Sequence, residues 1–259
     1  MKRAALFFSC LLCSCSVAAQ APASTNAPSS KQPVAAPALA VFPAPDAVLN
    51  RYIEALGGRA ALGKITSRTL RGTFSVPSQN ITGEAQIDMT APDHFYSLVK
   101  ISDDVRFIQA FDGKVGWSYD PQHGLREMAG VELDQIRRSS QFEYELRFRE
   151  IFPDLRVVDK ADEGNGAAWV LEAKPATGNA ERFYFDTETG LLVRHDSIQA
   201  TADGEIAIVH RYSDYTAVDG IKVPTLIHHT DPNIEWDVKF SEVRNNVPVD
   251  PARFTKPSQ

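Results

Sequence analysis

Three histidines in the C-terminal half of the chain are the residues whose type and spacing could carry chemistry. His195, His210 and His229 are separated by 15 and 19 residues and lie in segments that alternate apolar and polar side chains. Three imidazoles bind Zn²⁺ with a fourth position left open, so the set is a candidate metal site. No His-Glu-x-x-His motif, cysteine ligand or Gly-x-Ser-x-Gly elbow accompanies it. We therefore expect polar side chains at the rim of a cavity, with no cofactor and no enzyme activity, and keep the metal site as the alternative.

The strands that carry these histidines determine how they face one another. The strands expected here are 191–200, 205–215, 221–230 and 234–243. The turns expected between them are Asp203-Gly204, Asp219-Gly220 and Pro232-Asn233. Counting outward from the turns puts His210 opposite His229 and His195 diagonal to His210, all on one face. His228 points to the other face, so the adjacent His228-His229 pair cannot chelate one ion.

The period of two extends over most of the chain and predicts the fold class. A helix is expected at 45–58, where an apolar stripe follows Pro45 and ends at Gly57-Gly58. Further strands are expected at 66–76, 80–90, 94–102, 105–111, 114–120, 154–160, 167–174 and 181–186, with a helical segment at 131–149. The chain is therefore expected to be mainly β (α+β). The prediction is an antiparallel, curved, incompletely closed β-barrel of about 11–12 strands covered by a helical lid.

Large apolar side chains fall on one face of this sheet and predict a cavity that holds one apolar ligand. In the N-terminal half, Ser78-Gln79, Asp103-Asp104 and Asp112-Gly113 are expected to be two-residue turns, and these turns determine which side chains share a face. The expected lining is Leu70, Phe74, Ile87, Met89, Phe95, Val99, Ile108, Trp117, Tyr119, Tyr212, Ile227, Trp236, Val238 and Phe240. The driving force for such binding would be burial of apolar surface.

The N-terminal residues read as a targeting segment and a linker. A basic start and a short apolar run predict a signal peptide over 1–19, cleaved after Ala19. A second route is a lipobox-like Leu12-Cys13-Ser14-Cys15, which would leave Cys15 lipidated and associated with the membrane. Residues 20–44, rich in Ala, Pro and Ser, are expected to be a linker to one domain at 45–259. The expected location is the periplasm, with an outer-membrane lipoprotein as the alternative.

Composition excludes some classes of partner. The 259 residues are 43% hydrophobic and carry a formal net charge of −6, so nucleic-acid binding has no electrostatic support. All three cysteines lie within the first 15 residues, so the mature domain is expected to rest on its core without disulfides. We expect a monomer.

Several segments resemble periplasmic lipoprotein carriers. "FIQAFDGKVGWSYDPQ" (107–122) resembles the Asp-Gly-Lys hairpin of the LolA and LolB carriers, and "VDPARFTKP" (249–257) resembles their closing segment. "TAPDHFYSL" (90–98) stands in the place of their Arg-Pro-x-x-Phe strand. "YIEALGGRAALGKI", "ERFYFDTETGLLVRHD" and "DYTAVDGIKVP" resemble outer-membrane lipoprotein-sorting-like relatives.

The resemblance spans about 46–257 and implies an open barrel closed by helices, with a cavity for a lipid or a lipoprotein acyl chain. Ala91 stands where the carriers have the arginine of their lid latch, so a static binder and a carrier that opens and closes are both open alternatives. Another alternative is an envelope assembly module that has a filled interior and binds a protein partner.

Overall fold

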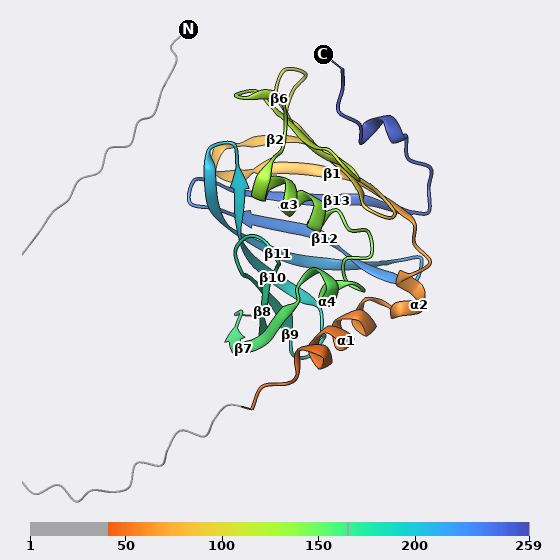
Figure 1. Cartoon of the computed structure of the whole chain (residues 1–259), viewed down its shortest axis with the longest axis vertical. Helices are drawn as coiled ribbons and strands as arrows, with labels where there is room; N and C mark the ends of the chain where they lie inside the picture. Colours follow the sequence, from red (N-terminus) through yellow and green to blue (C-terminus); the bar gives the residue numbers. More distant parts are fainter. Residues whose placement is uncertain (1–40, 165, 259) are drawn as a thin grey trace, which may run out of the picture. The chain divides into compact units, whose positions relative to one another are not determined.

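One antiparallel sheet forms the framework of the domain (Figure 1). The structure, a computed structural model, describes residues 41–164 and 166–258. The expected signal peptide, Cys15 and residues 20–40 of the expected linker lie outside the described residues. Among the helices of the described ranges, none is long and apolar enough to cross a membrane.

The sheet has 13 strands within the described residues. They are β1 (Ser67–Val76), β2 (Ile81–Thr90), β3 (His94–Lys100), β4 (Arg106–Asp112), β5 (Gly116–Asp120), β6 (Gly124–Glu127), β7 (Asp154–Asp162), β8 (Ala167–Lys174), β9 (Glu181–Asp186), β10 (Leu192–Thr201), β11 (Gly204–Val218), β12 (Ile221–Thr230) and β13 (Glu235–Asn245). Their order is β6-β5-β4-β3-β2-β1-β13-β12-β11-β10-β9-β8-β7, so hairpins spread in both directions from the β1–β13 pair. β6 and β7 lie at the two ends of this order and do not pair with each other, so the sheet is not closed. The mainly β, antiparallel and incompletely closed sheet is confirmed, with 13 strands where about 11–12 were expected. The additional strand is β6, whose four residues include a single apolar one and give no alternating pattern.

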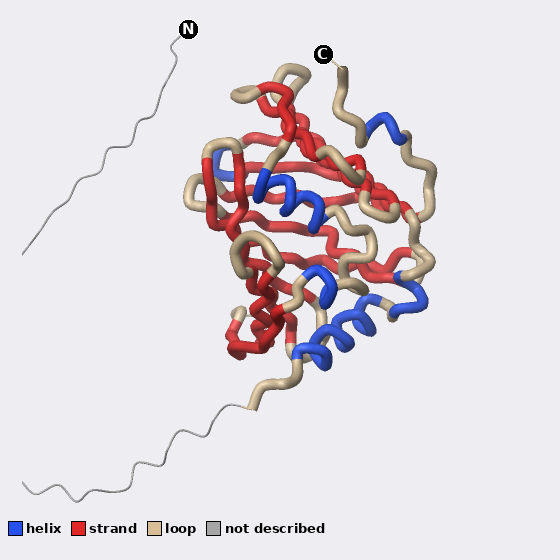
Figure 2. Tube along the Cα trace, viewed as in Figure 1, coloured by secondary structure: helices blue, strands red, loops and turns tan. Residues whose placement is uncertain are grey.

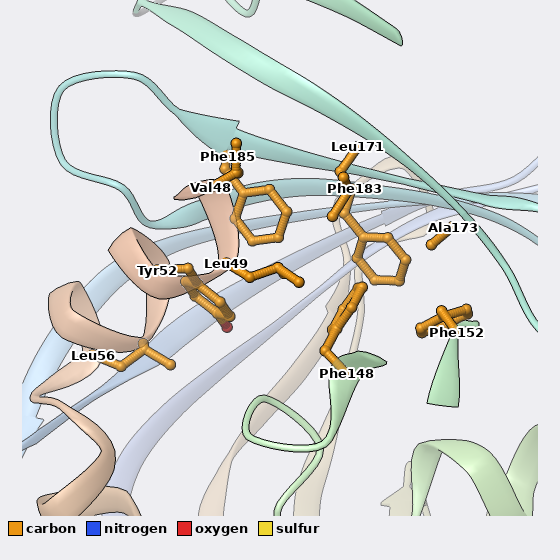
Figure 3. Packing of buried hydrophobic residues seen from close by; sticks show 10 residues of the cluster. All are labelled: Val48, Leu49, Tyr52, Leu56, Phe148, Phe152, Leu171, Ala173, Phe183 and Phe185. Atoms are coloured by element: carbon orange, nitrogen blue, oxygen red, sulfur yellow. The ribbon is translucent and has the colours of Figure 1, made fainter. Parts of the chain in front are cut away.

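The first helix forms where its apolar stripe predicted it. α1 (Pro45–Leu56) begins with Pro at its first position and ends at Gly57, whose φ of 123° favours glycine. Its buried residues are Val48, Leu49, Tyr52, Ile53 and Leu56. Of these, Val48, Leu49, Tyr52 and Leu56 pack with Leu171, Phe183 and Phe185 of the sheet into a core cluster (Figure 3). The short helix α2 (Arg59–Leu62) follows.

The expected helical segment 131–149 is two helices with turns between them (Figure 2). α3 (Gly130–Ser139) contacts β4, β5 and β10, and α4 (Phe148–Ile151) adds Phe148 to the cluster around α1. Gln135 holds α3 to the sheet: its side-chain amide donates to the Ile198 carbonyl at 2.6 Å and accepts from the Ala200 amide at 2.8 Å. β10 pairs with β9 only as far as Asp196, so Gln135 bonds to backbone groups of β10 that have no partner on β9.

The register of the N-terminal half differs from the prediction at one loop. Lys100 pairs with Arg106, and the Ile101 amide donates to the Val105 carbonyl, so the loop has three residues (102–104) and not two. An odd loop moves every following side chain to the opposite face. β4 therefore places Phe107, Gln109 and Phe111 on the face of Phe95 and Val99. The prediction that Ile108, Trp117 and Tyr119 share that face is wrong.

Those three residues lie on the other side of the sheet, and the C-terminal segment packs there. The indole of Trp117 is 3% exposed and donates to the Phe254 carbonyl at 2.7 Å, next to the short helix η2 (Pro251–Arg253). Ile108 pairs with Tyr119, and the Arg106 guanidinium lies 5.1 Å from the centre of the Tyr119 ring. Trp117 is thus part of the core that fixes the C-terminus.

Candidate functional site

The inner face of the sheet carries a cavity of about 560 Å³, within the size range of small-molecule sites. The predicted residues that line it are Phe74, Ile87, Phe95, Val99, Tyr212, Ile227, Trp236, Val238, Phe240, His210 and His229. Cavities of about 360 and 340 Å³ share Phe95 and Tyr212 with it. The remaining inward residues Leu70, Met89 and His195 line these two. The sheet therefore brings together the predicted residues except Ile108, Trp117 and Tyr119.

The cavity wall also contains residues that the sequence analysis missed. Phe107 and Gln109 were missed because the odd loop before β4 inverted their predicted face. Arg68 lies two residues before Leu70 on β1 and shares its face, so the period of two could have predicted its inward position. Tyr144 and Glu181 come from the turn segment after α3 and the start of β9. No periodicity could have placed Tyr144.

Two of the three histidines form a hydrogen-bonded chain beside a tryptophan. His210 lies opposite His229, as predicted, and the His229 Nδ1 is 3.0 Å from the His210 Nε2. The His229 Nε2 lies 3.0 Å from an Asp231 carboxylate oxygen, and its ring stacks on Trp236 at 4.3 Å. Burial raises the pKa of Asp231, but the hydrogen bonds from His229 and from two backbone amides outweigh burial and hold the pKa below its usual value. Asp231 is therefore an ionised carboxylate, which can only accept. His229 therefore donates to Asp231 and accepts from the His210 Nε2–H, which leaves the His210 Nδ1 as an acceptor.

His195 belongs to a different polar group. It pairs directly with His210 and not diagonally, because the β10–β11 turn is at Ala202-Asp203, one residue before the predicted position. The His195 Nε2 lies 2.8 Å from Glu181, which also accepts from Arg138 of α3 at 2.7 Å. Burial raises the pKa of Glu181, but His195 and Arg138 outweigh it and hold the pKa below its usual value. This group joins α3 to β9 and β10.

The bonding of the histidines argues against the alternative metal site. The His210 and His229 nitrogens that approach each other share one hydrogen bond, and the His195 Nε2 is occupied by Glu181. Within residues 41–164 and 166–258, no group of three His, Cys, Asp or Glu side chains is arranged to hold a metal ion. His228 lies on the other face, as predicted, and bonds to Asp237 at 2.7 Å.

The buried imidazole of His210 should make stability depend on pH. Burial, followed by the nearby His229 and His195, lowers the pKa of His210 from 6.5 to about 3. Because the unfolded chain binds this proton below pH 6.5 and the folded chain does not, the free energy of unfolding falls as pH drops from 6.5 towards 3. We expect the wild type to lose roughly 1 kcal/mol more per pH unit than His210→Gln, which keeps an N–H donor for His229. Urea unfolding at pH 7, 6 and 5 measures this, and parallel pH profiles would contradict it.

The chain has a LolA-like fold. Among solved structures it is similar to a LolA superfamily protein from Nitrosomonas europaea (TM-score 0.53, 12% identity, 82% of this chain and 97% of that one). It is also similar to a putative outer membrane lipoprotein-sorting protein domain from Vibrio parahaemolyticus (TM-score 0.54, 11% identity, 82% and 98%). A third is a DUF1329 family protein from Desulfovibrio piger (TM-score 0.54, 14% identity, 82% and 97%). No protein-family model and no curated protein matches the sequence, and at these identities the similarity concerns the fold alone.

Proposed function

We propose that this protein binds a lipid or an acyl chain on the inner face of its sheet, in the bacterial periplasm. The observation that carries the proposal is the cavity of about 560 Å³, walled by aromatic and aliphatic side chains. Burial of a sixteen-carbon chain contributes roughly 10 kcal/mol before the costs of binding, at about 0.8 kcal/mol per methylene. The LolA-like fold and the lipoprotein-sorting name of one similar structure support the same class of ligand.

The proposal includes a role for α3 as a lid. Its residues Ile136 and Ser139 line the 360 Å³ cavity opposite strand residues such as Ser197 and His210. Four side-chain attachments hold it within the described residues. They are Gln135 on β10, Arg138 on Glu181, Arg126 paired with Glu132 at 2.7 and 2.6 Å, and the Thr177 hydroxyl, which donates to Asp134 at 3.1 Å. Opening the lid requires these polar bonds to be exchanged for water, whereas a static binder would keep them.

The second candidate is an envelope interaction module with a filled interior. A cavity of this size that side chains leave open favours the binding protein. A module that needs no ligand would be more stable with side chains packed into that space. Co-purification of a protein partner together with an absence of apolar ligand would favour the module.

We further propose export by the signal peptide, followed by cleavage after Ala19 or by lipidation of Cys15. The mass of the mature N-terminal peptide separates the two routes. A peptide that begins with Gln20 supports a periplasmic protein, and an acylated Cys15 supports an outer-membrane lipoprotein. An N-terminal peptide that retains residues 1–14 would contradict both.

Tryptophan fluorescence tests binding directly, since Trp236 lines the cavity and Trp117 and Trp169 do not. In a Trp117→Phe/Trp169→Phe variant, titration with palmitate is expected to shift the emission of Trp236 and to saturate. His229→Ala in the same background removes the imidazole stacked on the indole and should alter the starting spectrum without abolishing saturation. An emission that does not change up to the solubility limit of palmitate would argue against binding.

A further inference from the structure

One guanidinium lines the cavity system without a carboxylate partner. Arg68 pairs with Met89 on the inner face and lines the 340 Å³ cavity. Its Nε donates to the Asn245 Oδ1 at 3.0 Å. Within the described ranges, Nη1 and Nη2 form no hydrogen bond and no ion pair. A partly buried guanidinium therefore keeps two nitrogens available to whatever occupies the cavity.

Arg68 is held in this orientation by a second residue. Asn245 is 8% exposed and donates through its Nδ2 to the Asp219 carboxylate at 3.2 Å. That bond fixes the amide so that its oxygen faces the Arg68 Nε. Since the Nε edge is used within the fold, the guanidinium is pre-positioned to offer its Nη atoms.

The other cations around the cavities differ from Arg68. Arg138 is neutralised by Glu181 at 2.7 Å, and Lys222 is exposed to water. Burial lowers the pKa of Arg68, while nearby Glu145 opposes this without forming an ion pair. A guanidinium withdrawn from water without a partner is costly, and a bidentate oxyanion offsets the cost.

Neutral donors surround the same cavity. The hydroxyls of Tyr52, Tyr144 and Tyr212 belong to residues that line it. Burial raises the pKa of each of these phenols, so they remain protonated and able to donate. The 340 Å³ cavity thus combines a cation with hydroxyl donors, whereas the adjoining 560 Å³ cavity is mostly apolar. The two share Ile87, Phe95, Tyr212, Ile227 and Phe240 in their walls.

Resting on the proposed function, we propose that the ligand is an anionic amphiphile whose carboxylate or phosphate head binds Arg68 while its acyl chain lies in the apolar cavity. The head replaces the missing partner of the guanidinium, and the chain fills the space beside Trp236. Glu145 lines the same cavity, and its negative charge repels an anionic head. Removing that charge should therefore strengthen anion binding.

Titrations with three ligands that share a sixteen-carbon acyl chain test the proposal: palmitate, 1-palmitoyl-lysophosphatidate and monopalmitoylglycerol. The wild type is expected to bind at least one anionic ligand about tenfold or more tightly than the neutral one, and the better of the two identifies the head as carboxylate or phosphate. Arg68→Gln should lose about tenfold or more for that anion and stay within about twofold for monopalmitoylglycerol. Glu145→Gln should bind the anion more tightly. The control Lys114→Gln, at an exposed lysine that lines none of these cavities, should change little.

The outcomes separate this inference from the proposed function. If Arg68→Gln weakens all three ligands equally, or if the wild type binds the neutral ligand as well as the anions, the anion site is refuted while lipid binding stands. If the wild type binds none of the three, the proposed function itself fails. Should Arg68→Gln fold poorly, Glu145→Gln decides: unchanged or weaker anion binding in that variant overturns the proposal.

Discussion

Ser97→Trp is expected to reduce the affinity for palmitate at least about tenfold, because it places an indole inside the main cavity. Ser97 lies on β3 between Ile87 of β2 and Gln109 of β4, and all three line the 560 Å³ space. Excluding only two methylenes from that space costs about 1.6 kcal/mol, which corresponds to more than tenfold in affinity. Calorimetric titration of palmitate into the variant measures the effect.

The matched control for this substitution is Thr73→Trp. Thr73 is exposed on β1, on the face opposite its neighbour Phe74, whose side chain lines the cavity. This variant adds the same side chain to the sheet but leaves the cavity open, so palmitate affinity should remain within about twofold of the wild type. Equal losses in the two variants would mean that palmitate binds elsewhere.

Glu181→Gln is expected to lower the free energy of unfolding by roughly 3 kcal/mol, because it leaves a buried arginine without its counter-charge. The side chains of Arg138 and Glu181 are 13% and 9% exposed, and His195 bonds to the same carboxylate. Urea unfolding at pH 7 measures the loss. Hydrogen exchange should also rise in α3, since Arg138 is one of its attachments to the sheet.

A second carboxylate provides the control. Glu172 also pairs with two arginines, but these are 68% and 55% exposed, so Glu172→Gln should cost less than about 1 kcal/mol. The difference between wild type and Glu181→Gln should be full above the usual pKa of 4.5 and shrink as pH falls through the lowered folded pKa. Comparable losses in the two variants at pH 7 would contradict a buried network that holds α3.

The sequence predicted most of the inner face for two reasons. The strands have a period of two, and most connecting loops have an even number of residues, as the predicted two-residue turns do. The β10–β11 turn lies one residue from its predicted position, yet His195, His210 and His229 still share a face, since such a shift changes pairing by two residues. The loop at 102–104 has an odd number of residues, which inverted the predicted face of Ile108, Trp117 and Tyr119.

The parts that could not be predicted depend on contacts between distant segments. Arg138 meets Glu181 across 43 residues, and Trp117 meets Phe254 across 137. Neither pair leaves a periodic signal in the sequence. Arg68 did leave one, because it lies two residues before Leu70 on β1 and therefore on the same face. As a charged residue, however, it does not belong to the apolar pattern that marks inward positions.

Native mass spectrometry of the protein purified from envelope extracts without detergent tests the central claim most directly, namely that the inner face of the sheet binds an apolar chain. We expect adducts with the mass of an acylated small molecule, which are lost on denaturation and depleted in Ser97→Trp but not in Thr73→Trp. An adduct-free wild-type protein that also fails to take up added palmitate would contradict it.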